Sequence, residues 1–168
     1  MADESIKIVI LASHWGRAIP LPAQNEKQSA DALARTLAAA KSLEDFIVEI
    51  KKRGKRVVLV ASIPISPLFA RTKMIKRSLL RHWEVNLAGI PRAELERTQG
   101  PLRVLLRNIA KKTGAEWIDP TSHLCSESSC PTISKQGTGV YMDETHLSSN
   151  YVRDYVTFLD QFILFGQK

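Results

Sequence analysis

Three short apolar runs predict the strands of one sheet. Ile6–Ala12, Lys55–Ala61 and Glu116–Asp119 are rich in β-branched or aromatic side chains. The first two are almost continuous in Val, Ile and Leu, which is typical of strands buried on both faces of a parallel sheet. We therefore expect a parallel sheet built from these three segments.

Helical spacing fills the stretches between the strands. Apolar residues recur three and four positions apart from Gln28 to Arg53, and Gly54 follows as a terminating glycine. The predicted apolar face consists of Leu33, Leu37, Ala40, Leu43, Phe46, Ile47 and Ile50. Strand, helix and strand in this order predict a right-handed βαβ unit.

Two helices are expected between the second and third strands. Met74–Leu87 is predicted to be helical, with Trp83 half-buried. A further helix begins near Pro91, is interrupted at Gly100-Pro101, continues over Leu102–Lys112 and ends at Gly114.

The last part of the chain begins with a polar segment. Residues Pro120–Gly139 are rich in Ser, Thr, Gly and Cys, and their length favours a functional loop. A short extended piece, Val140–Met142, and a final helix over Asn150–Leu164 follow. The predicted apolar face of this helix consists of Val152, Tyr155, Val156, Leu159 and Ile163.

The whole pattern predicts an α/β fold: a three-layer α/β/α sandwich with a parallel sheet, as one domain over residues 1–168. Functional sites of such sheets lie at the carboxyl ends of the strands. Here those ends are Ser13-His14-Trp15, Ser62-Ile63-Pro64 and the segment after Asp119.

Composition narrows the class of protein. The 168 residues are 44% hydrophobic and 24% charged, ordinary values for a globular protein. No apolar run reaches the roughly 18 residues that span a bilayer. The start Met-Ala-Asp-Glu-Ser has neither the basic region nor the apolar core of a secretory signal.

The net charge of +7 raises the question of an anionic partner. Basic residues cluster at Lys51–Arg56, Arg71–Arg81 and Lys111–Lys112. The first and last clusters coincide with expected helix ends, where cations offset the helix dipole. Aromatic residues for base stacking are not interleaved with them, so no nucleic-acid partner is expected.

Two cysteines, Cys125 and Cys130, lie close in sequence. A disulfide between them would imply an oxidising compartment, which the absence of a secretory signal does not support. The chain has no CxxC and no zinc-finger spacing, and its four histidines are scattered, so we expect no metal and no cofactor.

The segment with the clearest chemistry is Tyr141-Met142-Asp143-Glu144-Thr145-His146-Leu147-Ser148. A carboxylate can accept the imidazole Nδ1–H, which leaves Nε2 as general base for a hydroxyl nucleophile. Asp143 and His146 stand three apart immediately before the final helix. Spacing alone is compatible with a helix cap as well as with catalysis.

This segment resembles the last block of the SGNH hydrolase superfamily, in which an Asp-x-x-His supplies two members of a Ser-His-Asp triad. The longer stretch His123–Ser148 resembles the SGNH domain that is fused to membrane-bound family 3 acyltransferases. Ile-Val-Ile-Leu-Ala-Ser-His-Trp, ending at Trp15, and Arg-Val-Val-Leu-Val-Ala-Ser-Ile-Pro, ending at Pro64, are similar to two strands of that family. The resemblance extends over essentially the whole chain.

The resemblance implies O-acetylation of a bacterial surface polysaccharide such as lipopolysaccharide. It implies the membrane acyltransferase domain of a parent chain and a polysaccharide acceptor as partners. The parent's membrane helices would place Cys125 and Cys130 at the periplasmic face of the inner membrane, where they can form a disulfide. A chain that stands alone would instead be cytoplasmic.

The nucleophile block of the superfamily, Gly-Asp-Ser, does not occur in this sequence. The chain therefore resembles the C-terminal two-thirds of an SGNH domain whose first strand is missing, and we expect an inactive fragment. Loss of that strand would expose a hydrophobic sheet edge. Ser13 is the alternative nucleophile, because it ends a strand; a structural serine that bonds the loop backbone is the other interpretation.

Three further residues have two interpretations each. His14 can face the cleft as a substrate or oxyanion contact, or be a polar residue at a strand end. Trp15 can line the acyl or sugar pocket or belong to the core. His123 can touch substrate or lie exposed in a loop. A non-catalytic module that binds a glycan or an anionic partner through Arg71–Arg81 remains the alternative to an acyl-transfer enzyme.

Overall fold

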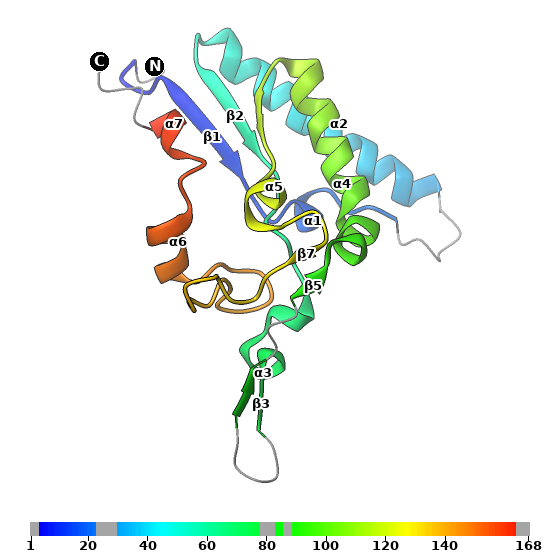
Figure 1. Ribbon diagram of the computed structural model, residues 1–168. Helices are drawn as coiled ribbons and strands as arrows, with labels where there is room; N and C mark the ends of the chain where they lie inside the picture. Colours follow the sequence, from blue (N-terminus) through cyan, green and yellow to red (C-terminus); the bar gives the residue numbers. More distant parts are fainter. Residues whose placement is uncertain (1–3, 23–29, 78–82, 86–88, 164–168) are drawn as a thin grey trace. The chain divides into compact units, whose positions relative to one another are not determined.

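The computed structural model describes residues 4–22, 30–77, 83–85 and 89–163 (Figure 1). The chain forms two compact units. The first comprises Met1–Ser62 and Gly100–Asp119, and the second comprises Ile63–Gln99 and Pro120–Lys168.

The first unit contains the predicted parallel sheet. Its strands are β1 (Ile8–Ala12), β2 (Arg56–Val60) and β6 (Glu116–Ile118), in the order β1-β2-β6. Ile8 pairs with Arg56 and Val58 with Glu116, and both pairings are parallel. The predicted class, an α/β fold with a parallel sheet, is confirmed.

Two long helices cover one face of this sheet. They are α2 (Ala30–Lys52) and α4 (Arg92–Thr113), which run beside each other in Figure 1. Residues of both helices belong to one core together with Val57 and Leu59 of β2. That core consists of Trp15, Ile19, Ala40, Ile47, Val57, Leu59, Leu106, Ile109 and Ala110. The short helix α1 (Trp15–Ala18) follows β1 directly.

The predicted apolar face of α2 is only partly correct. Ala40 and Ile47 are buried, and Leu43 and Ile50 pack against the core, but Leu33, Leu37 and Phe46 are exposed. A stripe at three- and four-residue spacing is wider than the strip of helix that a three-stranded sheet can cover. The first two residues of the predicted range, 28 and 29, lie outside the described part of the chain.

The expected burial of the first strand is also wrong. β2, which lies between two strands, is buried from Val57 to Val60, whereas Ile10 and Ala12 of β1 are exposed. β1 has one strand partner among the described residues, so it is an edge strand.

The second unit packs short elements around Phe69 and Tyr141. Its core consists of Phe69, Ile90, Leu95, Cys130, Val140 and Tyr141. The strands β5 (Ile90–Pro91) and β7 (Ser129–Cys130) pair antiparallel. The helices are η1 (Pro67–Phe69), α3 (Arg71–Met74), α5 (Pro120–Leu124), α6 (Ser149–Tyr155) and α7 (Asp160–Ile163). The expected loop 120–139 therefore contains α5 and β7.

The predicted helix Met74–Leu87 is wrong. The chain forms β3 (Ile75–Arg77), which pairs antiparallel with β4 (Trp83–Val85). Ile75 lies opposite Val85 in this pair, so the backbone of this segment pairs across a two-stranded ribbon instead of forming helical hydrogen bonds. Residues 78–82 and 86–88, and the side chain of Trp83, lie outside the described part of the chain.

The expected interruption at Gly100-Pro101 is wrong as well. α4 runs continuously from Arg92 to Thr113 with Pro101 inside it. A proline removes one backbone donor and costs about 3 kcal/mol in a helix interior. Packing on both sides of it offsets this cost, because Leu95 lies in the core of the second unit and Leu106 in that of the first.

The single final helix is replaced by α6 and α7, and residue 164 lies outside the described part. Val156 ends α6 in a non-helical conformation. Phe158, between the two helices, stacks on His123 of α5, with ring centroids 4.7 Å apart. That contact, together with the low helix propensity of Val156 and Thr157, explains the break. Val152 and Tyr155, expected on an apolar inner face, are exposed at 42% and 36%.

Candidate active site

Asp143 and His146 lie at the tip of a narrow hairpin in the second unit. Tyr141 and Leu147 form an antiparallel bridge, and the N–H of Met142 donates to the carbonyl of His146 at 2.9 Å. The four residues from Asp143 to His146 make the turn. The sequence folds this way because an aspartate at the first turn position can accept backbone N–H groups two and three residues ahead.

The carboxylate of Asp143 accepts the hydrogen bonds of this turn. Its Oδ1 accepts from the backbone N–H of Thr145 at 2.8 Å and of His146 at 2.9 Å. The Nδ1 of His146 lies 2.9 Å from both Oδ1 and Oδ2. The two predicted partners are therefore in contact, and this contact leaves Nε2 of His146 without a role in holding the ring.

These hydrogen bonds lower the pKa of Asp143 to about 2. The largest cause is the backbone N–H of Thr145, followed by the side-chain hydrogen bond to His146. An ionised carboxylate at neutral pH favours the tautomer that carries its proton on Nδ1 and orients the ring. Nε2 is then an acceptor, as a general base requires.

Thr145 adds a third polar group to the pair. Its hydroxyl lies 3.2 Å from Oδ1 of Asp143 and 3.1 Å from Nδ1 of His146. The spacing of Asp143 and His146 alone does not single out Thr145; only the turn geometry brings its hydroxyl to both partners.

The hairpin is anchored at its base. Tyr141 is buried and stacks on Phe69, with ring centroids 3.7 Å apart. The N–H of Ser66, in the segment that follows β2, donates to the carbonyl of Glu144 at 3.2 Å. On the other side Ser148 caps α6: its hydroxyl accepts from the N–H of Tyr151 and donates to the carbonyl of Gly139. The turn is thus held from its base, from the side and from the helix that follows.

Both side chains of the pair remain open to solvent. His146 is 67% exposed and Asp143 is 46% exposed. A reacting group can therefore approach Nε2 without a rearrangement of the hairpin.

Three further candidates, Ser13, His14 and Trp15, lie in the first unit, where β1 ends beside the end of β2. The hydroxyl of Ser62 accepts from the N–H of Trp15 at 3.3 Å and donates to the carbonyl of Ser13 at 3.4 Å. The two strand ends therefore meet, as expected for neighbouring parallel strands. Ser13 is exposed and its role as nucleophile stays a prediction.

Trp15 belongs to the core of the first unit. It is 7% exposed, and its indole N–H donates to the carbonyl of Val60 at 2.7 Å. This position accounts for the tryptophan by packing, which was one of its two interpretations. His14 precedes α1, and its buried Nδ1 has no hydrogen-bond partner among the described residues. His123 stacks on Phe158.

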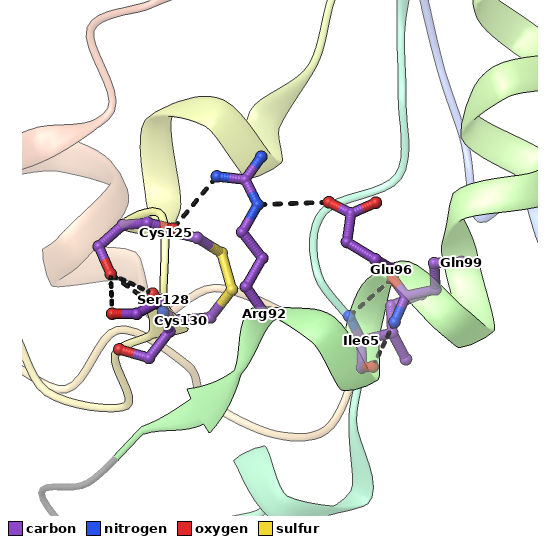
Figure 2. The surroundings of a disulfide bond; sticks show 9 residues. Ile65, Arg92, Glu96, Gln99, Cys125, Ser128 and Cys130 are labelled. Carbon is purple, nitrogen blue, oxygen red and sulfur yellow. Dashed lines mark hydrogen bonds and ion pairs between the residues drawn. A yellow bond between two sulfur atoms is a disulfide. The ribbon is translucent and has the colours of Figure 1, made fainter.

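The two cysteines form a disulfide in the second unit (Figure 2). The loop that it closes contacts the start of α4: the N–H of Arg92 donates to the carbonyl of Ser128, and its guanidinium donates to the carbonyl of Ser126. The disulfide thereby holds the carbonyls of Ser126 and Ser128 against the first turn of α4.

The described residues offer no group of three or more His, Cys, Asp or Glu side chains that could hold a metal. Within the same residues, no helix combines the length and the apolar character needed to cross a membrane.

The fold and the pair together describe a class: an α/β protein with a parallel sheet and an exposed carboxylate–imidazole pair before its last helices. The model of the SGNH domain, described as fused to AT3 domains, matches residues 1–158. The chain therefore belongs to this family, as its motifs predicted. No curated protein matches the chain.

Among solved structures, the chain is similar to the lipopolysaccharide acetyltransferase periplasmic domain of Salmonella ser. Paratyphi A, with a TM-score of 0.53 and 16% identity. The similarity covers 95% of this chain and 57% of that chain, so the chain spans little more than half the length of that structure. At this identity the similarity shows the fold.

Proposed function

We propose that the chain is part of the acyl-transfer domain of a polysaccharide O-acetyltransferase, and that Asp143 and His146 are two members of its Ser-His-Asp triad. The observation that carries the proposal is the position of His146 Nδ1, 2.9 Å from both oxygens of Asp143. His146 Nε2 takes the proton of a serine hydroxyl as the serine attacks the acyl donor. It returns the proton to the leaving group, and an acyl-serine results.

The serine comes from a segment outside these 168 residues, and the chain alone is inactive. Two observations support this part of the proposal. The sequence contains no Gly-Asp-Ser, and β1 has one strand partner among the described residues, which leaves its other edge for a further strand. The acceptor is a cell-surface polysaccharide, and the partner is the AT3 membrane domain of a parent chain.

The site of action is the periplasmic face of the inner membrane. The Cys125–Cys130 disulfide supports this location, because disulfides persist in the periplasm and are rare in the cytosol.

The test identifies the reacting serine in the native polypeptide. Source cells are fractionated and blotted, and the polypeptide is then labelled with a fluorophosphonate, which forms a phosphonate ester with an activated serine as fluoride leaves. We expect a membrane band larger than 18.8 kDa. We expect the label on a serine outside residues 1–168, and we expect His146→Ala to reduce labelling by at least about a hundredfold. Glu144→Gln, an exposed position of the same turn, is the matched control and leaves labelling unchanged.

Two other outcomes would overturn parts of this proposal. Label on Ser13 would show that this chain carries its own nucleophile. A native polypeptide that takes no label would favour the second candidate function, a glycan-binding module on a degenerate SGNH fold, which the absence of Gly-Asp-Ser also supports. Most of the side chains from Arg71 to Arg81 that such a module was expected to use lie outside the described part.

A further inference from the structure

A groove of about 570 Å³ lies between α4 and β6 in the first unit. Its lining residues are Val104, Arg107, Asn108, Ala110, Lys111, Ala115 and Trp117. None of them belongs to the hairpin of Asp143 and His146. The volume falls within the range of small-molecule sites.

One wall of the groove is a continuous stripe of α4. Val104, Arg107, Asn108 and Lys111 are spaced three and four apart, so their side chains lie on one face of the helix. All four are exposed, and Val104 is 59% exposed. The stripe therefore presents two cations and one amide beside an apolar side chain.

The two cations have no acidic partner among the described residues. Some other cations of this unit are paired: Lys112 with Glu44 at 2.6 Å, and Arg56 with Glu116 at 2.9 Å. The helix dipole accounts for Lys111, which lies in the last turn of α4, but not for Arg107. Arg107 lies more than one turn before the end of α4, and Lys51 already donates to the carbonyls of Thr113 and Gly114 there. Arg107 and Lys111 are thus available to an anion.

The opposite wall is the edge of the sheet at Trp117. The N–H of Ala61 donates to the carbonyl of Ile118, so the neighbouring residue, Trp117, points its own N–H and carbonyl away from β2. Its ring packs beside the core and is half-buried. β6 has only three residues, which offers an extended peptide too few backbone groups to pair with.

We propose that this groove binds an acidic sugar residue of the polysaccharide acceptor, an identification that rests on the proposed function. The carboxylate lies between Arg107 and Lys111, where a guanidinium can bind it through two hydrogen bonds. The amide of Asn108 and the backbone of Trp117 bind sugar hydroxyls. The indole face of Trp117 and the side chain of Val104 cover the apolar C–H face of the pyranose.

The test measures binding to the 168-residue chain by NMR, with the indole N–H of Trp117 as a reporter. The probe is a disaccharide that contains glucuronic acid, and its uncharged counterpart is the same disaccharide with glucose in that position. We expect the acidic disaccharide to shift the Trp117 signal. We expect the neutral disaccharide to bind at least about tenfold more weakly.

The variant Arg107→Gln/Lys111→Gln removes both cations and is expected to weaken binding by about tenfold or more. The matched control, Arg35→Gln/Lys52→Gln, removes two exposed cations from α2 in the same unit and leaves the affinity unchanged. Equal binding of the neutral disaccharide, equal loss in the control, or absence of binding would overturn the proposal. Equal affinity for inorganic phosphate at the same signals would show a general anion site instead.

The binding proposal and the proposed function can be contradicted separately. Arg107→Gln/Lys111→Gln leaves fluorophosphonate labelling of the native polypeptide unchanged, because the groove does not contain the reacting groups. Conversely, His146→Ala abolishes labelling and leaves disaccharide binding unchanged.

Discussion

Phe69 and Tyr141 stack almost in parallel, with an angle of 10° between their rings and 3.7 Å between their centroids. Both residues are buried in the core of the second unit. Tyr141 is also the first strand residue of the hairpin whose tip carries Asp143 and His146. The position of the pair therefore depends on an aromatic contact at the base of that hairpin.

The hydroxyl of Tyr141 contributes nothing to this contact. It is buried and has no hydrogen-bond partner among the described residues, and burial raises its pKa. We expect Tyr141→Phe to leave stability unchanged or to raise it, because an unpaired buried hydroxyl is costly. Tyr141→Ala is expected to cost about 3–5 kcal/mol, as for other large aromatic residues. Urea unfolding measures both, and a large loss in Tyr141→Phe would reveal a partner for the hydroxyl.

The depressed pKa of Asp143 makes one contribution to stability dependent on pH. An aspartate has a pKa of about 3.9 when unfolded, and the folded value is about 2. The stabilisation is therefore complete above about pH 4 and is lost as the pH falls through about 2. We expect the stability difference between wild type and Asp143→Asn to shrink over this range in urea unfolding. Glu144→Gln is the control. A stability difference between wild type and Asp143→Asn that stays constant with pH would contradict the expectation.

The Cys125–Cys130 disulfide closes a loop of six residues, which the chain-entropy treatment values at about 2 kcal/mol. Reduction is expected to lower the free energy of unfolding by about this amount. The contacts of Arg92 with the carbonyls of Ser126 and Ser128 depend on the same loop. Cys125→Ala/Cys130→Ala should unfold identically with and without reductant. A wild-type chain that is insensitive to reductant would argue against the bond.

The edge strand β1 is expected to cause self-association of the isolated chain. Ile10 is exposed on this strand, and an apolar edge is a template for pairing with another copy. Ile10→Lys should increase the fraction of monomer in size-exclusion chromatography, because edge lysines oppose pairing. Leu37→Lys, which places the same charge at an exposed position of α2, should have no effect. A wild-type chain that is a stable monomer would count against the missing strand.

The local pattern of the sequence correctly predicted the three strands of the parallel sheet and the end of the helix that follows the first strand. β2 is continuous in Val and Leu and is the central strand, and α2 ends just before Gly54 as expected. The Asp-x-x-His pair was predicted from its spacing and its family resemblance, because both partners lie in one turn. A contact between residues only three positions apart in sequence depends little on the rest of the fold.

Long-range packing decided the features that the pattern missed. Whether residues 75–77 form a helix or a strand depends on the pairing of Ile75 with Val85, and whether Pro101 breaks α4 depends on the cores at both of its ends. These energies come from residues far apart in sequence, so periodicity within one segment does not contain them.

The sequence by itself determined the fold class, the family and the contact between Asp143 and His146, because strand composition and a three-residue spacing are local properties. Only the tertiary structure decided that Phe69 supports the hairpin and that Trp15 belongs to the core. It also brought Arg107, Lys111 and Trp117 to one groove, since a helix face and a strand edge meet there through packing alone.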